Sequence, residues 1–135
     1  MVYVTRREVF SAAHRLFNPN LTDEENDKIF DKCNNLHGHG HNYILEVTVA
    51  GNVNPQTGYV IDLKKLKNIL RESVLSKVDH KHLNYDTDFL KDKIPTAENI
   101  AIGIWSQLVD KITEGKLFSV KIYETENNYV EYKGE

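Results

Sequence analysis

The chain has few of the features that assign a protein to a membrane, a secretory pathway or a nucleic acid. It has a single cysteine, Cys33, so no intramolecular disulfide can form, and this favours a reducing compartment, for which we expect the cytoplasm. No apolar run approaches the ~20 residues that span a bilayer, and the N-terminal segment resembles a strand rather than a secretory signal. With 17 basic and 20 acidic residues, the net charge of −3 disfavours a general nucleic-acid binder.

Several common catalytic and nucleotide-binding signatures are also absent. The sequence contains no G-x-G-x-x-G, no Walker A motif, no G-x-S-x-G and no H-E-x-x-H. It therefore gives no sign of a nicotinamide site, a P-loop NTPase or a serine hydrolase.

Hydrophobic periodicity predicts one α+β domain spanning residues 1–135. Two alternating segments precede two amphipathic ones, and two more alternating segments follow. The order β-β-α-α-β-β predicts a four-stranded antiparallel sheet with two helices on one face. Such a sheet has two open edges, and pairing with other subunits is one way to cover them. The expected strands are 2–11, 42–51, 117–125 and 129–132. The first of the two helices begins after Asp62 and extends to about Val78, and the second begins after Thr96 and extends to about Gly115. A further short helix is expected over about Asp23–Phe30.

Three histidines alternate with two glycines in the segment His37–His41. Residues two apart on an extended chain point to the same side, so a pair of these imidazoles can converge on one metal ion. Zinc suits imidazole, and three protein ligands leave a fourth position open for water or substrate. His14, at the end of the first strand, lies near His39 and His41 if the first two strands are antiparallel neighbours. The alternative is a flexible polar loop with incidental histidines.

Two further groups are candidates for acid–base chemistry. Cys33 lies in a polar segment beside the histidines, where neighbouring cationic or metal-bound groups favour a thiolate base or nucleophile, although a lone cysteine is usually a small buried hydrophobe. In Asp79-His80, the carboxylate can orient and stabilise the imidazole. The same pair can equally be a charge arrangement at a helix end.

One acidic position is a candidate for substrate binding. Glu124 can accept two parallel hydrogen bonds from a flat N–H/NH₂ edge such as that of a pterin or a guanine, although an ordinary exposed strand residue is the more common case. Thr96 and Glu98 are interpreted as helix-capping residues, and their spacing alone assigns them no chemistry.

The joint occurrence of eight motifs makes the sequence resemble the 6-pyruvoyl-tetrahydropterin synthase family in its animal form. The resemblance covers nearly the whole chain and implies the tunnelling fold, in which sheets from three subunits close into a barrel with helices outside. It also implies a hexamer made of two stacked trimers, with sites between subunits. The motifs are Phe10–Leu16, Asp23–Asn26, Cys33–Asn35, Gly38–Tyr43, Asp79–Lys81, Thr96–Asn99, Tyr123–Thr125 and Tyr132–Glu135.

The resemblance also implies a reaction and a set of site residues. The implied enzyme is a zinc-dependent lyase of tetrahydrobiopterin biosynthesis that converts 7,8-dihydroneopterin triphosphate into 6-pyruvoyl-tetrahydropterin and triphosphate, with Mg²⁺ as a further candidate ligand of the triphosphate. The family's zinc ligands fall on His14, His39 and His41, its catalytic cysteine on Cys33, its Asp–His pair on Asp79 and His80, and its pterin-anchoring glutamate on Glu124, with Thr96 and Glu98 as further substrate-binding candidates.

Three questions stay open at the level of sequence. The shorter spacing from Cys33 to His37 fits bacterial relatives that make 6-carboxy-tetrahydropterin for the queuosine route, so the zinc pair can be His37/His39, although we prefer His39/His41. A zinc- and pterin-binding module without turnover is the third functional alternative. The candidates for contact with the triphosphate are Arg6, Arg15, Lys32 and Lys81.

Overall fold

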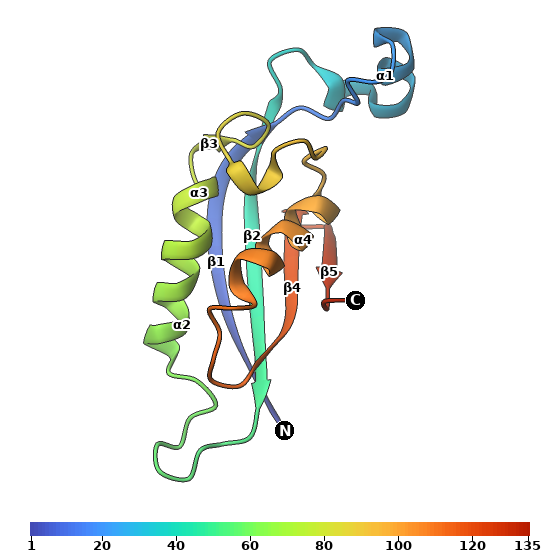
Figure 1. Cartoon of the computed structure of the whole chain (residues 1–135). Coiled ribbons are helices and arrows are strands. Elements are labelled where there is room, and N and C mark those ends of the chain that lie inside the picture. Colours follow the sequence, from blue (N-terminus) through green and yellow to red (C-terminus); the bar gives the residue numbers. More distant parts are fainter.

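Two long strands form the centre of the computed structural model, which describes residues 1–135 (Figure 1). Strand β1 (Val2–His14) pairs with β2 (His39–Gly51) in antiparallel register over its whole length. Strand β4 (Lys116–Thr125) pairs antiparallel with the other side of β2, and β5 (Asn128–Tyr132) completes a hairpin with β4. The predicted set of four antiparallel strands is therefore confirmed, although the first two are longer than predicted.

The sheet also contains a fifth strand that the periodicity did not predict. Strand β3 (Lys81–His82) lies parallel to the end of β1, and the strand order is β3-β1-β2-β4-β5. The His80 N–H donates to Ser11 O at 2.6 Å, and the Leu83 N–H donates to Ala13 O at 2.8 Å. Two residues are too few for an alternating pattern, so only the three-dimensional pairing identifies this strand.

The first long helix is continuous but changes its winding. It comprises α2 (Leu63–Leu70), a π-helical turn η2 (Arg71–Leu75) and α3 (Ser76–Val78), and Asp62 caps it by accepting from the Lys64 N–H at 2.9 Å. In an α-helix, each step of four residues drifts by about 40°. The wider π turn offsets this drift, so residues four apart stay buried. These buried residues are Leu66, Leu70, Val74 and Val78, whereas Leu63, expected in the same stripe, is exposed.

Helix α4 (Ala97–Leu108) begins where the sequence predicts it, because Thr96 Oγ1 accepts from the Asn99 N–H at 3.2 Å. It ends earlier than predicted. The chain leaves the helix after Leu108 and turns, yet Ile112 is still buried against the core. The apolar spacing therefore marked the buried face correctly but extended past the end of the helix.

Both long helices pack on the sheet in one core, as predicted; Figure 1 shows α2 and α3 beside β1, and α4 in front of β2 and β4. The segment between β1 and β2 (residues 15–38), called the excursion below, contains the short helix α1 (Asp23–Phe30) and then a 3₁₀ turn η1 (Asp31–Asn34). Helix α1 has the bounds predicted from its capping box. In Figure 1, α1 lies beyond the end of the sheet, on the side where β1 ends and β2 begins. No helix combines the length and apolar character that crossing a bilayer requires.

Candidate active site

The apolar stripe on the helix-covered face of the sheet ends in a group of histidines. Phe10, Ala12 and His14 alternate along β1 and are all buried. Because side chains two apart share a face, His39 and His41 on β2 continue the buried stripe that begins at Tyr43. The antiparallel register places His14 opposite His39. The sheet pairing itself therefore brings the histidines together.

Four side chains at this point can hold one metal ion. A ligand atom from each of His14, His39, His41 and Glu124 lies within 4.8 Å of the others. The Nε2 atoms of His14 and His39 are 3.2 Å apart, and His41 Nε2 is 3.2 Å from Glu124 Oε1. The buried His41 Nε2 has no hydrogen-bond partner by geometry, although it lies close to this carboxylate. Buried imidazole nitrogens and a carboxylate oxygen gathered this closely fit the donor set of a metal site.

The ring of His14 is oriented by a main-chain carbonyl, that of Pro95, which no sequence pattern indicates. His14 Nδ1 donates to Pro95 O at 2.7 Å, and this leaves the lone pair of Nε2 directed at His39. A carbonyl in this position fixes the tautomer of a metal-binding histidine. The buried hydroxyl of Tyr43 lies 3.3 Å from the same Nδ1, and Tyr43 stacks on Phe10. Only the alternation along β2 hinted that Tyr43 adjoins the histidines.

Burial keeps two of these imidazoles in the form that binds metal. Loss of solvation lowers the pKa of His14 and of His41 below the usual 6.5, and the neighbouring histidines act in the same direction. Glu124 opposes this effect in both cases, and the hydrogen bond to Pro95 opposes it for His14. Burial is the largest contribution, so both rings are neutral at pH 7.

We expect the metal-free protein to lose stability as the pH falls below about 6.5. The folded pKa of His14 and of His41 is lower than the unfolded value of 6.5, so the unfolded chain binds more protons below that pH. The melting temperature of chelator-treated protein, followed from pH 8 to pH 5, should fall over the lower half of this range. Protonation of Asp79 also lowers the stability, but only near its usual pKa of 3.8, which lies below the pH range of this measurement. A melting temperature that rises below pH 6.5 would contradict the expectation.

Gly38 is required by the close approach of the loop to the end of β1. Its φ is +79°, and a Cβ atom there would lie 2.7 Å from His14 O. His37, just before it, is exposed and lies outside the group of four ligand atoms. The structure thus brings together His39 and His41 rather than His37 and His39.

The other catalytic candidates lie outside the metal group. Cys33 is partly buried in η1. Burial raises the pKa of the Tyr43 phenol, and smaller contributions come from Glu124 and then Cys33, so the thiol lies in the neighbourhood of this ring. Asp79 and His80 do face each other, with Asp79 Oδ1 3.0 Å from His80 Nδ1. Hydrogen bonds, first from the Ser11 N–H and then from His80, lower the pKa of Asp79. The His80 side chain is 82% exposed, so it faces solvent in the single chain.

A small pocket adjoins Glu124 and contains a second carboxylate, that of Glu98 at the start of α4. Thr125 and Tyr129 belong to its wall. Thr96 does not line this pocket, and its hydroxyl caps α4. The structure places Glu98 in the same pocket as Glu124.

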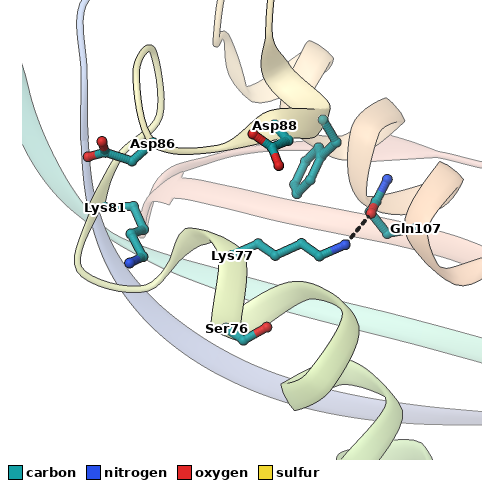
Figure 2. Close-up of a pocket in the computed structure, with 7 residues that line it drawn as sticks. Ser76, Lys77, Lys81, Asp86, Asp88 and Gln107 are labelled. Atoms are coloured by element: carbon teal, nitrogen blue, oxygen red, sulfur yellow. Dashed lines mark hydrogen bonds between the residues drawn. The ribbon is translucent and has the colours of Figure 1, made fainter.

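Lys81, a candidate for triphosphate binding, belongs to a separate pocket among the helices. Figure 2 shows Lys77 extending across this pocket, where its Nζ donates to Gln107 Oε1 at 2.7 Å. Asp86 and Asp88 also line the pocket. The two carboxylates offset the charges of Lys77 and Lys81, so this pocket offers a triphosphate no excess of positive charge.

Comparisons with known proteins show the family of this chain. Residues 3–135 match the model of the family described as 6-pyruvoyl tetrahydropterin synthase. The chain belongs to this family. It is 49% identical over 132 residues to the 6-pyruvoyl tetrahydrobiopterin synthase of Homo sapiens, covering 98% of this chain and 91% of the human protein.

A solved structure of Caenorhabditis elegans 6-pyruvoyl tetrahydropterin synthase superposes with a TM-score of 0.94 at 44% identity, covering 99% of this chain and 96% of that one. A more distant similarity, 33% identity over 149 residues, links the chain to the 6-carboxy-5,6,7,8-tetrahydropterin synthase of Rickettsia typhi, covering 97% of this chain and 99% of that protein. The fold of this chain is that of the synthase family, and its relatives include two kinds of synthase.

Proposed function

We propose that this protein is a zinc-dependent lyase of tetrahydrobiopterin biosynthesis. It converts 7,8-dihydroneopterin triphosphate into 6-pyruvoyl-tetrahydropterin and triphosphate. The observation that carries the proposal is the convergence of His14, His39 and His41 at the end of the buried stripe, in a chain of this family. The reaction combines elimination with internal redox and needs no hydride donor, which agrees with the lack of a dinucleotide motif.

His14, His39 and His41 would hold the zinc ion, since three neutral imidazoles leave a position open to substrate. When bound, zinc supplies Lewis-acid chemistry to the side-chain hydroxyls of the substrate and so makes the adjacent C–H bonds more acidic. The neighbouring Glu124 adds a negative charge that balances part of the charge of the ion. Pro95 O holds His14 in the orientation that this role requires.

Glu124 binds the flat N–H/NH₂ edge of the pterin ring, and Glu98 lines the same pocket. A carboxylate accepts two parallel hydrogen bonds from such an edge. Because Glu124 also adjoins His41, the pterin ring is held next to the metal ligands. Held this way, the substrate side chain would lie beside the three imidazoles.

Cys33 removes a carbon-bound proton from the substrate side chain as a thiolate, and the ring is reduced as the side chain is oxidised. His80, oriented by Asp79, relays protons during tautomerisation and loss of triphosphate. The exposure of His80 in the single chain agrees with a site completed between subunits.

Assembly into a hexamer made of two trimers follows from the same proposal, with the sheets of each trimer closed into a barrel. Strand β3 covers only two residues of β1, so most of that edge is free to pair, and β5 offers the opposite edge. The single cysteine suits a cytoplasmic location, and Mg²⁺ is the natural counter-ion of the released triphosphate.

Product analysis tests the proposed reaction. Zinc-loaded protein incubated with 7,8-dihydroneopterin triphosphate should release triphosphate and form 6-pyruvoyl-tetrahydropterin. The alternative, a 6-carboxy-tetrahydropterin synthase, is suggested by the more distant similarity to the Rickettsia typhi protein and would yield acetaldehyde with the carboxylated pterin. Binding of the pterin without any release of triphosphate would instead indicate a non-catalytic binding module.

A further inference from the structure

The excursion that carries Cys33 is held by amides rather than by an apolar core. Over residues 15–38, only the side chains of Asn26 and Asn34 are buried. The apolar side chains Ile29 and Leu36 in the same segment are exposed. Four other apolar side chains, Leu16, Phe17, Leu21 and Phe30, are only partly buried, so polar contacts have a large share in placing this segment relative to the sheet.

Asn34, the residue after Cys33, is linked to two separate elements. Its Nδ2 donates to Asp27 Oδ1 on α1 at 2.7 Å. The Arg15 Nε donates to both oxygens of Asn34, at 3.1 Å to the main-chain O and 3.2 Å to Oδ1. A planar guanidinium presents its donors in fixed directions, so this contact fixes the orientation of the turn.

Arg15 is itself held from the other side. The Arg15 N–H donates to Asn84 Oδ1 at 2.8 Å, and Asn84 Nδ2 donates back to Arg15 O at 2.8 Å. The guanidinium also lies over the ring of Phe17, 4.3 Å from its centroid. Arg15 was a candidate for triphosphate binding, but the structure uses its Nε to hold the Cys33 turn.

The main chain at Cys33 completes the connection to the metal group. The Leu16 N–H donates to Cys33 O at 2.8 Å. Arg15 and Leu16 directly follow His14, so the residues that fix the cysteine turn are the next two after a metal ligand. The position of the thiol relative to the three imidazoles is therefore set by the end of β1.

We propose that Arg15 and Asn34 are positioning residues that hold the Cys33 thiol at its working distance from the metal site. They touch no reacting atom in this proposal and act through the turn. The proposal rests on the function proposed above for Cys33. We call the contacts of Arg15 and Asn34 the clamp. A displacement of about 1 Å at a catalytic group lowers turnover by on the order of 100-fold, so loss of the clamp should lower kcat measurably.

The test compares Asn34→Ala and Arg15→Lys with Asn26→Ala. Asn26 is the other buried amide of the excursion, with Nδ2 donating to Asn18 O at 3.0 Å and Oδ1 accepting from the Asn18 N–H at 2.7 Å, and it does not adjoin Cys33. We expect Asn34→Ala and Arg15→Lys to lower kcat by about 10- to 100-fold, with KM and zinc content little changed. The Asn26→Ala variant should keep its kcat. The double variant should be no slower than the slower single one, because both substitutions release the same turn.

A second readout does not depend on the proposed reaction. Cys33 is the only thiol, so the rate of alkylation by iodoacetamide reports on this turn alone. Alkylation should be at least about threefold faster in Asn34→Ala than in the parent or in Asn26→Ala, because the turn opens locally. If the parent protein has no lyase activity, this comparison still tests the clamp. If Asn34→Ala does not fold, Asn34→Asp replaces it: this variant keeps the acceptor for Arg15 but places a second carboxylate next to that of Asp27. We expect the same changes in kcat and in alkylation rate for it. Unchanged alkylation and kcat in the Asn34 and Arg15 variants, or equal losses in Asn26→Ala, would overturn the proposal.

Discussion

Replacement of Cys33 by alanine is expected to reduce kcat by about 10²- to 10⁴-fold, the usual contribution of a well-placed acid–base group. Zinc content and pterin affinity should change little, because the thiol lies outside the group of metal ligands and does not line the pocket at Glu98 and Glu124. Steady-state kinetics with the pterin triphosphate, together with pterin binding at equilibrium, separate the two effects.

The matched control for Cys33 is chemical. Alkylation of the parent protein modifies only this residue and should abolish turnover to the same extent, whereas alkylation of Cys33→Ala should have no further effect. A Cys33→Ala variant that retains kcat within about fivefold of the parent would assign the proton abstraction to another group.

Replacement of His14 by alanine should remove the metal and, with it, detectable lyase activity. His14 supplies one of three imidazoles, and its substitution leaves His39 and His41 without a third ring to complete the site. Loss of the open metal position removes both substrate orientation and Lewis-acid chemistry, worth several kcal/mol in the transition state. Metal content per chain, measured after dialysis, should fall from about one to near zero.

His37→Ala is the matched control for the metal site, since His37 lies in the same loop but is exposed and outside the group of ligand atoms. It should keep its zinc and its activity. Zinc loss in His37→Ala together with zinc retention in His41→Ala would instead support the His37/His39 register.

Much of the fold follows from local signals in the sequence. The capping box at Thr22 and Glu25 fixed the start of α1, and the alternation from Tyr43 to Val49 identified β2. The π turn and strand β3 could not be predicted from local signals. The π turn depends on packing along a helix, and β3 depends on two backbone hydrogen bonds to a distant strand. Such features have no periodicity of their own.

The site was predictable to the extent that it depends on strand register. Antiparallel pairing of the first two strands was enough to place His14 near His39. The Pro95 carbonyl and the clamp at Arg15 and Asn34 involve main-chain atoms or residues with ordinary surface roles, so spacing alone could not select them. The Asp79–His80 contact could be predicted only as one of two alternatives, since adjacent residues need not face each other.

Anomalous scattering at the zinc edge, from crystals grown with one equivalent of zinc per chain, tests the central claim most directly. The account predicts one anomalous peak per chain, coordinated by nitrogens of His14, His39 and His41 and located beside Glu124. An absence of density between these three rings, or a peak held by His37 in place of His41, would contradict it.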